Sequence, residues 1–330
     1  MIISQTPLRI SFVGGGSDLE DFWKISPGKV ISTTIDKFIY VIVKGRFDDD
    51  IYLNYSKKEI VSAVSDIEHD LIRETMIKTG VRKSIEITTL ADIPSEGSGL
   101  GSSSSVTVGL LNALYAYRGI QVTAEQLAKE ACEIEIDILG KPIGKQDQYS
   151  VAYGGLNKIT FNSNGSVSID KITLSNNDLR KLGSNLLLYY TGINRKSSAI
   201  LNDQKKNITE KRIYIDNMVE LVSELEYILA STSSFKSIGN LLDRNWIQKK
   251  ELSKRISNKR IEEMYLLALN NGATGGKISG AGGGGFLLLN VPRGKQDKLR
   301  ESLKGYREFP FMLMTDGSKI IFNIKSEYWK

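Results

Sequence analysis

The most constraining feature of this sequence is a glycine- and serine-rich turn that joins a short β-branched segment to an apolar one. Residues 85–90 have the composition of a strand, and the string DIPSEGSGLGSSSS leads from Asp92 directly into the apolar residues 106–117. Glycine allows positive φ and close approach of a ligand to the backbone. The first turn of a helix carries unpaired N–H groups and a partial positive charge, which bind phosphate. The turn therefore predicts a phosphate-binding helix N-terminus. A flexible surface linker is the alternative, which the directly following helix disfavours.

Serine hydroxyls at the start of this helix add donors and oxygen ligands. Hard cations such as Mg²⁺ prefer oxygen, so a serine here is a candidate metal ligand. The turn is not a P-loop, because the sequence has no GxxxxGKS or GxxxxGKT string and no lysine directly after Gly101. The residues expected to hold nucleotide phosphates are Gly97, Ser98, Gly99, Leu100, Gly101, Ser102, Ser103 and Ser104.

Two further glycine clusters lie at 14–16 and 272–285. The second contains a formal GxGxxG string from Gly280 to Gly285, but a strand is expected after it at 286–291. A dinucleotide-binding turn needs a helix there, so that context fails. A loose hairpin is one interpretation of the cluster. Its glycine density favours another chain segment or a ligand lying against it.

Composition excludes several classes of protein. The 330 residues are 41% apolar and 25% charged, which suits a globular chain with a sizeable core. A single cysteine and a single histidine exclude a disulfide framework and a His- or Cys-rich metal centre. The net charge of +6 is spread out, and its denser stretches, 195–212 and 244–260, also carry acids. We expect a cytoplasmic protein that binds neither nucleic acid nor membrane, because no apolar run approaches the roughly 18 residues of a span and the N-terminus has no signal-peptide pattern.

The hydrophobic pattern predicts a mixed architecture. Strands are expected at 8–13, 30–35, 38–43, 85–90, 186–190, 286–291 and 319–324. Helices are expected at 66–79, 102–117, 123–139, 197–209, 211–230, 238–254, 260–271 and 294–303. Strands and helices mix without regular βαβ alternation, so the α+β class is expected rather than a doubly wound sheet. A domain boundary is expected between 165 and 183.

One carboxylate is out of place in the helix expected at 123–139. At 100° per residue the acids Glu130, Glu133 and Asp137 fall opposite the apolar arc, but Glu135 falls near its middle. A buried carboxylate costs several kcal/mol unless it is paired or bound to a metal. Glu135 is therefore either a metal ligand, a group with a shifted pKa, or half of an internal salt bridge.

Two other polar positions are candidates for chemistry. Asp147 follows a segment broken by glycine and proline and stands close to Lys145, so it is either a general base or a helix cap. Strand alternation places Arg9 and Ser11 on one face of the strand at 8–13, so Arg9 is a candidate phosphate-facing cation. Asp18 is either a helix cap or a hydroxyl binder.

The three glycine-rich blocks, in this order and spacing, resemble the motifs of the GHMP kinase superfamily. The strings TPLRISFVGGGSD, DIPSEGSGLGSSSS, ILGKPIGKQDQYSVAYGGLN and GGKISGAGGGGF are most similar to its D-glycero-D-manno-heptose 7-phosphate kinase branch. The resemblance implies an N-terminal domain, 1–175, of the ribosomal-S5-domain-2-like type that carries the ATP-phosphate loop. It implies a ferredoxin-like C-terminal domain, 176–330, with extra helices and the third motif.

The resemblance also implies roles for individual residues. Ser103 and Glu135 match the magnesium ligands, and Asp147 matches the aspartate that orients or deprotonates the acceptor hydroxyl. Arg9 matches an arginine beside that aspartate, and Lys145 is expected to reduce charge repulsion there. The residues expected to bind substrate are Asp18, Gly15, Gly16, Ser17, Gly282, Gly283 and Arg195.

Two departures from the family pattern affect these roles. Galactokinases have Glu-His where this chain has Gly15-Gly16, so their sugar contacts do not transfer intact. The interval from Glu135 to Asp147 is one residue longer than in mevalonate kinases. The distal sugar phosphate is assigned to Arg195 and Lys196, for which a helix-entry charge pair is the alternative.

The implied activity is transfer of the ATP γ-phosphoryl group, with Mg²⁺, to the anomeric hydroxyl of D-glycero-D-manno-heptose 7-phosphate, which gives the 1,7-bisphosphate. The partner is thus a small sugar phosphate, and a homodimer is compatible with the resemblance. Another sugar 1-kinase of the fucokinase type is the alternative enzyme. A non-catalytic ATP- and sugar-binding regulator of the same fold is the alternative outside catalysis.

Overall fold

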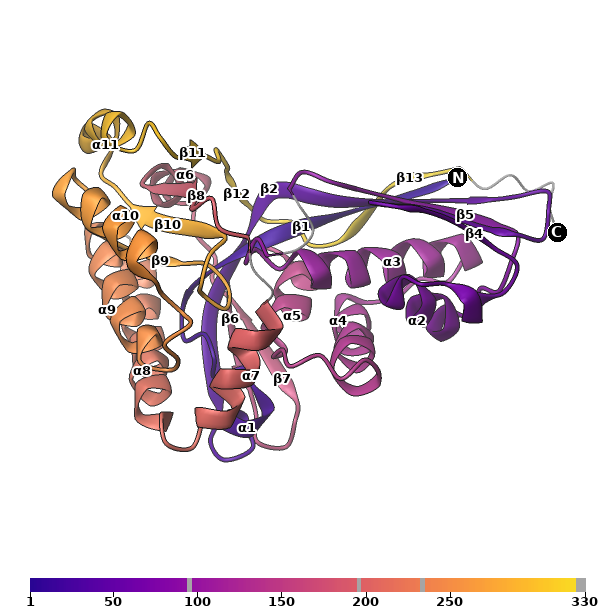
Figure 1. Cartoon of the computed structure of the whole chain (residues 1–330), viewed down its shortest axis with the longest axis horizontal. Helices are drawn as coiled ribbons and strands as arrows, with labels where there is room; N and C mark the ends of the chain where they lie inside the picture. Colours follow the sequence, from indigo (N-terminus) through magenta and orange to yellow (C-terminus); the bar gives the residue numbers. More distant parts are fainter. Residues whose placement is uncertain (94–96, 195–196, 232–234, 325–330) are drawn as a thin grey trace.

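The computed structural model describes residues 1–93, 97–194, 197–231 and 235–324 (Figure 1). Within these residues the strands form two sheets. The larger has the order β13-β1-β2-β5-β3-β4, with β6, β7 and β12 joined to it through β2. The smaller has the order β11-β8-β10-β9. Among the described pairs only β3–β5 is parallel, and helices of varied length pack around both sheets. The expected α+β class is confirmed.

The strands of the large sheet are β1 (Ile2–Val13), β2 (Gly28–Gly45), β3 (Ile51–Asn54), β4 (Lys58–Val61), β5 (Ile85–Ala91), β6 (Asn157–Phe161), β7 (Val167–Lys171), β12 (Leu313–Met314) and β13 (Lys319–Asn323). Those of the small sheet are β8 (Leu186–Tyr190), β9 (Gly275–Ile278), β10 (Phe286–Asn290) and β11 (Arg307–Glu308).

The α-helices are α1 (Glu20–Trp23), α2 (Asp70–Thr79), α3 (Ser102–Arg118), α4 (Ala124–Cys132), α5 (Gln146–Tyr153), α6 (Asn176–Ser184), α7 (Ser197–Asn207), α8 (Arg212–Ser231), α9 (Ile238–Lys250), α10 (Lys259–Asn270) and α11 (Gln296–Ser302). Of the described helices, none is long and apolar enough to cross a bilayer.

The long strands β1 and β2 are the frame on which the rest is built. Leu8, Ile10 and Phe12 are buried in the main core, and the alternate residues Arg9 and Ser11 are buried as well, so β1 is covered on both faces. The strands predicted at 30–35 and 38–43 are one strand. Pro7 pairs with Phe38 whereas Leu8 pairs with Ile35, so residues 36–37 form a bulge at the predicted break.

The predicted helix at 123–139 changes its winding partway along. Thr123 caps α4 by accepting a hydrogen bond from the Gln126 N–H at 3.1 Å. After Cys132 the chain continues as a π-helix, Glu133–Ile138. π-Helical turns are rare overall, and those that do occur are often found at functional sites.

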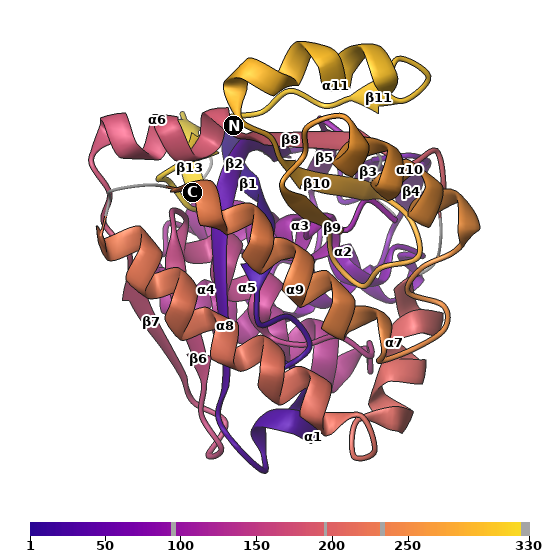
Figure 2. The same ribbon diagram turned by 90° about the vertical axis from the view of Figure 1, so that its left-hand side faces the viewer.

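The second core lies under helices of the C-terminal half. Trp246, Met264 and Leu287 are among its buried members, contributed by α9, α10 and β10. Helices α8 and α9 lie side by side and cross in front of β1 and β2 (Figure 2). Leu225 on α8 and Leu242 on α9 belong to the main core, so these helices connect the two sheets.

Candidate active site

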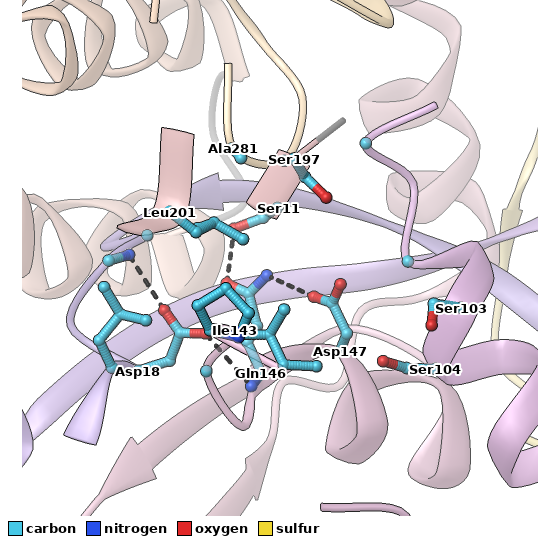
Figure 3. Close-up of a pocket in the computed structure, with 18 of the residues that line it drawn as sticks. Ser11, Asp18, Ser103, Ser104, Ile143, Gln146, Asp147, Ser197, Leu201 and Ala281 are labelled. Carbon is cyan, nitrogen blue, oxygen red and sulfur yellow. Dashed lines mark hydrogen bonds between the residues drawn. The ribbon is translucent and has the colours of Figure 1, made fainter. Parts of the chain in front are cut away.

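The three glycine-rich segments meet at one cavity of about 470 Å³ (Figure 3). Its walls include residues 15–16 after β1, residues 97–99 and 101–104 at the start of α3, residues 280–281 between β9 and β10, and Asp147 on α5. Segments more than 250 residues apart in sequence therefore share one wall, as the motif order predicts for a common ligand site.

The turn before α3 has the backbone that its glycines predict. Gly97, Gly99 and Gly101 all have positive φ, between 75° and 79°. Gly101 is the N-cap of α3, and because glycine has no side chain it offers no capping oxygen to the first N–H groups of the helix. Ser102 and Ser104 are buried, whereas Ser103 is exposed on the cavity wall. The arrangement presents main-chain donors and a hydroxyl to a ligand at the helix N-terminus.

The third glycine segment packs directly against this turn. It is the loop of the β9–β10 hairpin, but it is not a loose hairpin, because another chain segment lies against it as its glycine density predicts. A Cβ added at Gly99 would lie 2.4 Å from the Ser279 carbonyl oxygen, and one added at Gly280 would lie 2.6 Å from the Gly99 Cα. Glycine is required on both sides of this contact.

Glu135 reaches the start of α3 from the π-helix. Its side chain is 0% exposed, as its place on the apolar face predicts. Ser103 donates to one carboxylate oxygen, and Ser104 and Gln148 donate to the other, each at 2.7 Å. Burial raises the pKa of Glu135, while Lys141 and the three hydrogen bonds oppose that shift. The salt-bridge alternative does not hold among the described residues, since the hydrogen-bond partners of the carboxylate are neutral.

The Ser103–Glu135 pair fits a divalent cation that keeps several waters. Its two oxygens are 2.7 Å apart, and the Ser103 hydroxyl is on the cavity wall. The described residues contain no group of three or more acidic, histidine or cysteine side chains that could enclose a metal. Mg²⁺ is commonly bound by one or two protein oxygens together with substrate phosphates, so this sparse set suits it.

Arg9 joins the turn before α3 to Asp147. Its Nε and one terminal nitrogen donate to the two carboxylate oxygens of Asp147, both at 2.7 Å, and the other donates to the Gly99 carbonyl at 2.7 Å. Arg9 is 3% exposed, whereas the Asp147 side chain is 28% exposed and lines the cavity. A two-point guanidinium–carboxylate pair fixes the plane of the carboxylate.

Asp18 lies on the other side of Gln146 from Asp147 (Figure 3). Its carboxylate accepts from the N–H groups of Gly16, at 3.1 Å, and of Gln146, at 3.4 Å. It therefore caps α5 from a distant loop and also lines the cavity. Burial raises the pKa of Asp18, and repulsion from Asp147 raises it further.

Several residues predicted from the sequence point elsewhere. Lys145 does not lie beside the Asp147 carboxylate, because its ammonium donates to the Gly165 carbonyl at 2.9 Å and sits 4.4 Å from the Trp23 ring centre. Gly283 donates to the Ile256 carbonyl, and a Cβ on Gly282 would meet Ile256. Five of the predicted site residues do not line the described part of the cavity: Ser17, Leu100, Lys145, Gly282 and Gly283. Arg195 and Lys196 lie outside the described residues.

Sequence reasoning missed two buried lysines of the lining. Lys277 donates to the carbonyls of Ser11 and Phe12 at 2.9 and 3.0 Å, and Lys249 on α9 donates to the Gly280 carbonyl. The available signal was Lys277 itself, a charged residue among glycines that lies within the buried strand β9. Lys249 gave none, because it stands next to Lys250 on a helix with many charged residues.

Comparison with known proteins places these motifs in context. Residues 60–155 match the GHMP kinases N terminal domain, and residues 219–307 match the GHMP kinases C terminal domain. The D-glycero-alpha-D-manno-heptose 7-phosphate kinase of Campylobacter jejuni is 31% identical over 94% of this chain and 96% of its own length. A mevalonate kinase of Thermococcus sibiricus is 27% identical over 78% of this chain and 74% of its own.

Solved structures agree with the sequence comparison. A crystal structure titled as a D-glycero-D-manno-heptose 1-phosphate kinase from Bacteroides thetaiotaomicron superposes with a TM-score of 0.82 at 25% identity, over 99% of this chain and 100% of the other. A putative sugar kinase from Campylobacter jejuni superposes with a TM-score of 0.73 at 29% identity, over 97% of both chains.

Proposed function

This chain belongs to the GHMP kinases, and from that membership we propose that it phosphorylates the anomeric hydroxyl of D-glycero-D-manno-heptose 7-phosphate to give the 1,7-bisphosphate. The family consists of ATP-dependent phosphotransferases, and the near full-length similarity to a heptose 7-phosphate kinase identifies a sugar kinase. The observation that carries the proposal is the Asp147 carboxylate, which Arg9 orients on the wall of the cavity that also holds the α3 N-terminus.

Asp147 is the proton acceptor of the proposed reaction. Its carboxylate takes the proton of the anomeric hydroxyl as that oxygen forms a bond to the γ-phosphorus. The bond from this phosphorus to the β–γ bridging oxygen breaks, and ADP leaves with the electron pair. Phosphoryl transfer depends mainly on positioning and charge stabilisation. Arg9 therefore contributes to the rate by orienting the Asp147 carboxylate.

The start of α3 holds the ATP phosphates. The N–H groups of this turn and the Ser103 hydroxyl supply donors, and the positive φ of Gly99 and Gly101 sets the path of the backbone there. Ser103 and Glu135 are the residues that would hold Mg²⁺. When bound, Mg²⁺ neutralises charge that develops on the phosphate oxygens.

A coupled ADP-release assay tests the proposal. The acceptors are D-glycero-D-manno-heptose 7-phosphate, the 1-phosphate of the same heptose, sedoheptulose 7-phosphate, mannose 6-phosphate and fucose. Phosphorus NMR of the product then locates the new ester. We expect turnover with the heptose 7-phosphate and a new signal from an anomeric phosphate. Preference for fucose would favour a fucokinase-type enzyme, and preference for the 1-phosphate would reverse the order of the two phosphorylations. If the protein bound ATP but turned over none of these acceptors, the result would favour a non-catalytic regulator.

A further inference from the structure

The side-chain amide of Gln146 joins Ser11 on β1 to Asp147 on α5 (Figure 3). Its Nε2 donates to Asp147 Oδ1 at 3.2 Å, and its Oε1 accepts from the Ser11 hydroxyl at 3.0 Å. Gln146 and Ser11 are 6% and 5% exposed, respectively, so the bond between them is shielded from bulk water. Two buried side chains therefore lead from the central strand to the carboxylate of the proposed proton acceptor.

The carboxylate fixes the direction of these hydrogen bonds. An ionised carboxylate only accepts, so the Gln146 amide must turn its NH₂ group toward Asp147. The amide oxygen then faces Ser11, whose hydroxyl has to donate. Strand β1 is anchored at the same residue from the other sheet, because the Lys277 ammonium donates to the Ser11 carbonyl at 2.9 Å. The orientation of the Gln146 amide is thus set on both sides.

The two oxygens of the Asp147 carboxylate differ in their number of donors. Oδ1 accepts from Arg9 Nε at 2.7 Å and from Gln146, whereas the described residues give Oδ2 a single donor, a terminal nitrogen of Arg9. A carboxylate oxygen has two lone pairs, so Oδ1 is saturated and Oδ2 keeps one lone pair free. Oδ2 also lies beside the start of α3, since a Cβ added at Gly101 would be 3.5 Å from it.

We infer that Gln146 is a positioning residue that occupies Oδ1 of Asp147 and leaves Oδ2 as the atom that takes the proton of the acceptor hydroxyl. The inference rests on the proposed function, because it assumes that Asp147 is the proton acceptor. As the hydroxyl oxygen bonds to the γ-phosphorus, its proton moves to Oδ2, and ADP leaves with the electron pair of the broken bond. Oδ1 can keep its bonds from Arg9 and Gln146 throughout, because a carboxyl group protonated on one oxygen still accepts on the other.

Arg9 by itself does not distinguish the two oxygens. Its two-point contact fixes the plane of the carboxylate but gives one donor to each oxygen. The third donor, from Gln146, is what makes the oxygens unequal. Because the Gln146 amide bonds to the protein itself, its loss is expected to lower the rate of transfer and to leave the binding of nucleotide and acceptor largely unchanged.

The test is a double-mutant cycle on kcat that combines Gln146→Met with Asp147→Asn. Methionine is similar to glutamine in length but has no donor, and it leaves the main-chain N–H of residue 146 bonded to Asp18. Gln126→Met is the matched control. The Gln126 amide also donates to a carboxylate, that of Glu130 at 3.0 Å, but on α4 and away from the described cavity lining.

We expect Gln146→Met to lower kcat roughly 3- to 30-fold and to change the KM values for ATP and acceptor less than about threefold. In the Asp147→Asn background the same substitution should lower kcat less than about twofold, because the group that Gln146 positions is gone. Gln126→Met should match the wild-type chain. Ser11→Ala, which releases the amide without replacing it, is the second variant. It should lower kcat roughly 2- to 5-fold, and this loss should also vanish in the Asp147→Asn background.

The cycle separates this inference from the proposed function. Equal losses in the two backgrounds overturn the role of Gln146, because a side chain that only stabilises the fold lowers both rates alike. A higher KM for the acceptor with unchanged kcat also overturns it and makes Gln146 a substrate contact. If the cycle gives the expected result with a different sugar as acceptor, the proposed substrate is wrong and the role of Gln146 stands. Wild-type protein that turns over no acceptor overturns both.

Discussion

Glu135 is a carboxylate that the folded protein keeps away from water and supports with neutral donors. Burial raises its pKa in the folded state above the ordinary value of about 4.5. As pH rises above that value, the unfolded chain loses this proton first, so the free energy of unfolding falls until the folded-state pKa is passed. Asp18, whose pKa is also raised by burial, acts in the same direction. The site is thus less stable when both acids are charged and no cation is bound.

Glu135→Gln is expected to remove one part of this pH dependence. Without magnesium, the free energy of unfolding of the variant should fall less steeply with rising pH than that of the wild-type chain, as measured by urea denaturation. Magnesium-dependent nucleotide affinity should fall roughly 10- to 100-fold. Glu133→Gln is the control, because Glu133 lies on the same π-helix but pairs with Lys78 at 2.6 Å on the surface. If the magnesium dependence of nucleotide affinity were unchanged in Glu135→Gln, Glu135 would have a structural role and would not be a metal ligand.

Asp147→Asn tests the proposed proton acceptor. The asparagine amide keeps one oxygen that can accept from Arg9, but its NH₂ group replaces the second acceptor and it cannot take up a proton. We therefore expect kcat to fall roughly 10²- to 10⁴-fold while nucleotide affinity is retained. Steady-state kinetics and nucleotide titration measure the two effects separately. Asp137→Asn, at an exposed position, should behave as wild type. Near-normal turnover in Asp147→Asn would exclude Asp147 as the base.

At the scale of elements, the parts of the site with strong local signals were predictable. Helix α3 begins at Ser102 as expected, because the glycines before it and the apolar residues after it agree. The π-helix was not predictable, because the hydrophobic pattern of residues 123–139 predicts one continuous helix and gives no signal for the wider turn at Glu133–Ile138. Lys145 was misjudged for a similar reason. Lys145 is close to Asp147 in sequence, but its side chain contacts Gly165 in the β6–β7 turn and Trp23 in α1, and both are distant in sequence.

Gly99→Ala tests the contact between the second and third glycine segments. Gly99 and Gly140 both have positive φ, which costs alanine roughly 1–2 kcal/mol. A Cβ at Gly140 meets no described atom within 4 Å, whereas one at Gly99 meets the Ser279 carbonyl at 2.4 Å. Gly140→Ala should therefore show the backbone cost alone. Gly99→Ala should lose roughly 1–3 kcal/mol more by urea denaturation, together with nucleotide affinity. If Gly99→Ala and Gly140→Ala lost the same free energy of unfolding, the contact between the second and third glycine segments would not stabilise the fold.

At the scale of the whole molecule, the two ends of the chain belong to one sheet. Strand β13 pairs with β1 from Ile2 to Gln5, and β12 pairs with β2 at Thr34 and Ile35. Between them, Ser318 donates its N–H to the Val151 carbonyl of α5. A division at residue 175 stays a prediction, but the last strands cross that position to complete the sheet that carries Arg9. In the sequence β13 is marked only by its two isoleucines and β12 has no β-branched residue, and the partners of both strands lie some 300 residues earlier.

Removing the last two strands should therefore damage a site at the other end of the sequence. A chain that ends at residue 311 loses β12, β13 and the partly buried Leu313 and Ile320, which pack on the main core. We expect its free energy of unfolding to fall by roughly 3–6 kcal/mol from lost apolar burial and hydrogen bonds. Turnover should fall as well, because Thr34 and α5 lose their contacts with residues 314–318, and α5 carries Asp147. A chain that ends at residue 324 keeps both strands and is the control. If the shorter chain kept wild-type stability and activity, β12 and β13 would not stabilise the sheet, and the position of Asp147 would depend on the N-terminal elements alone.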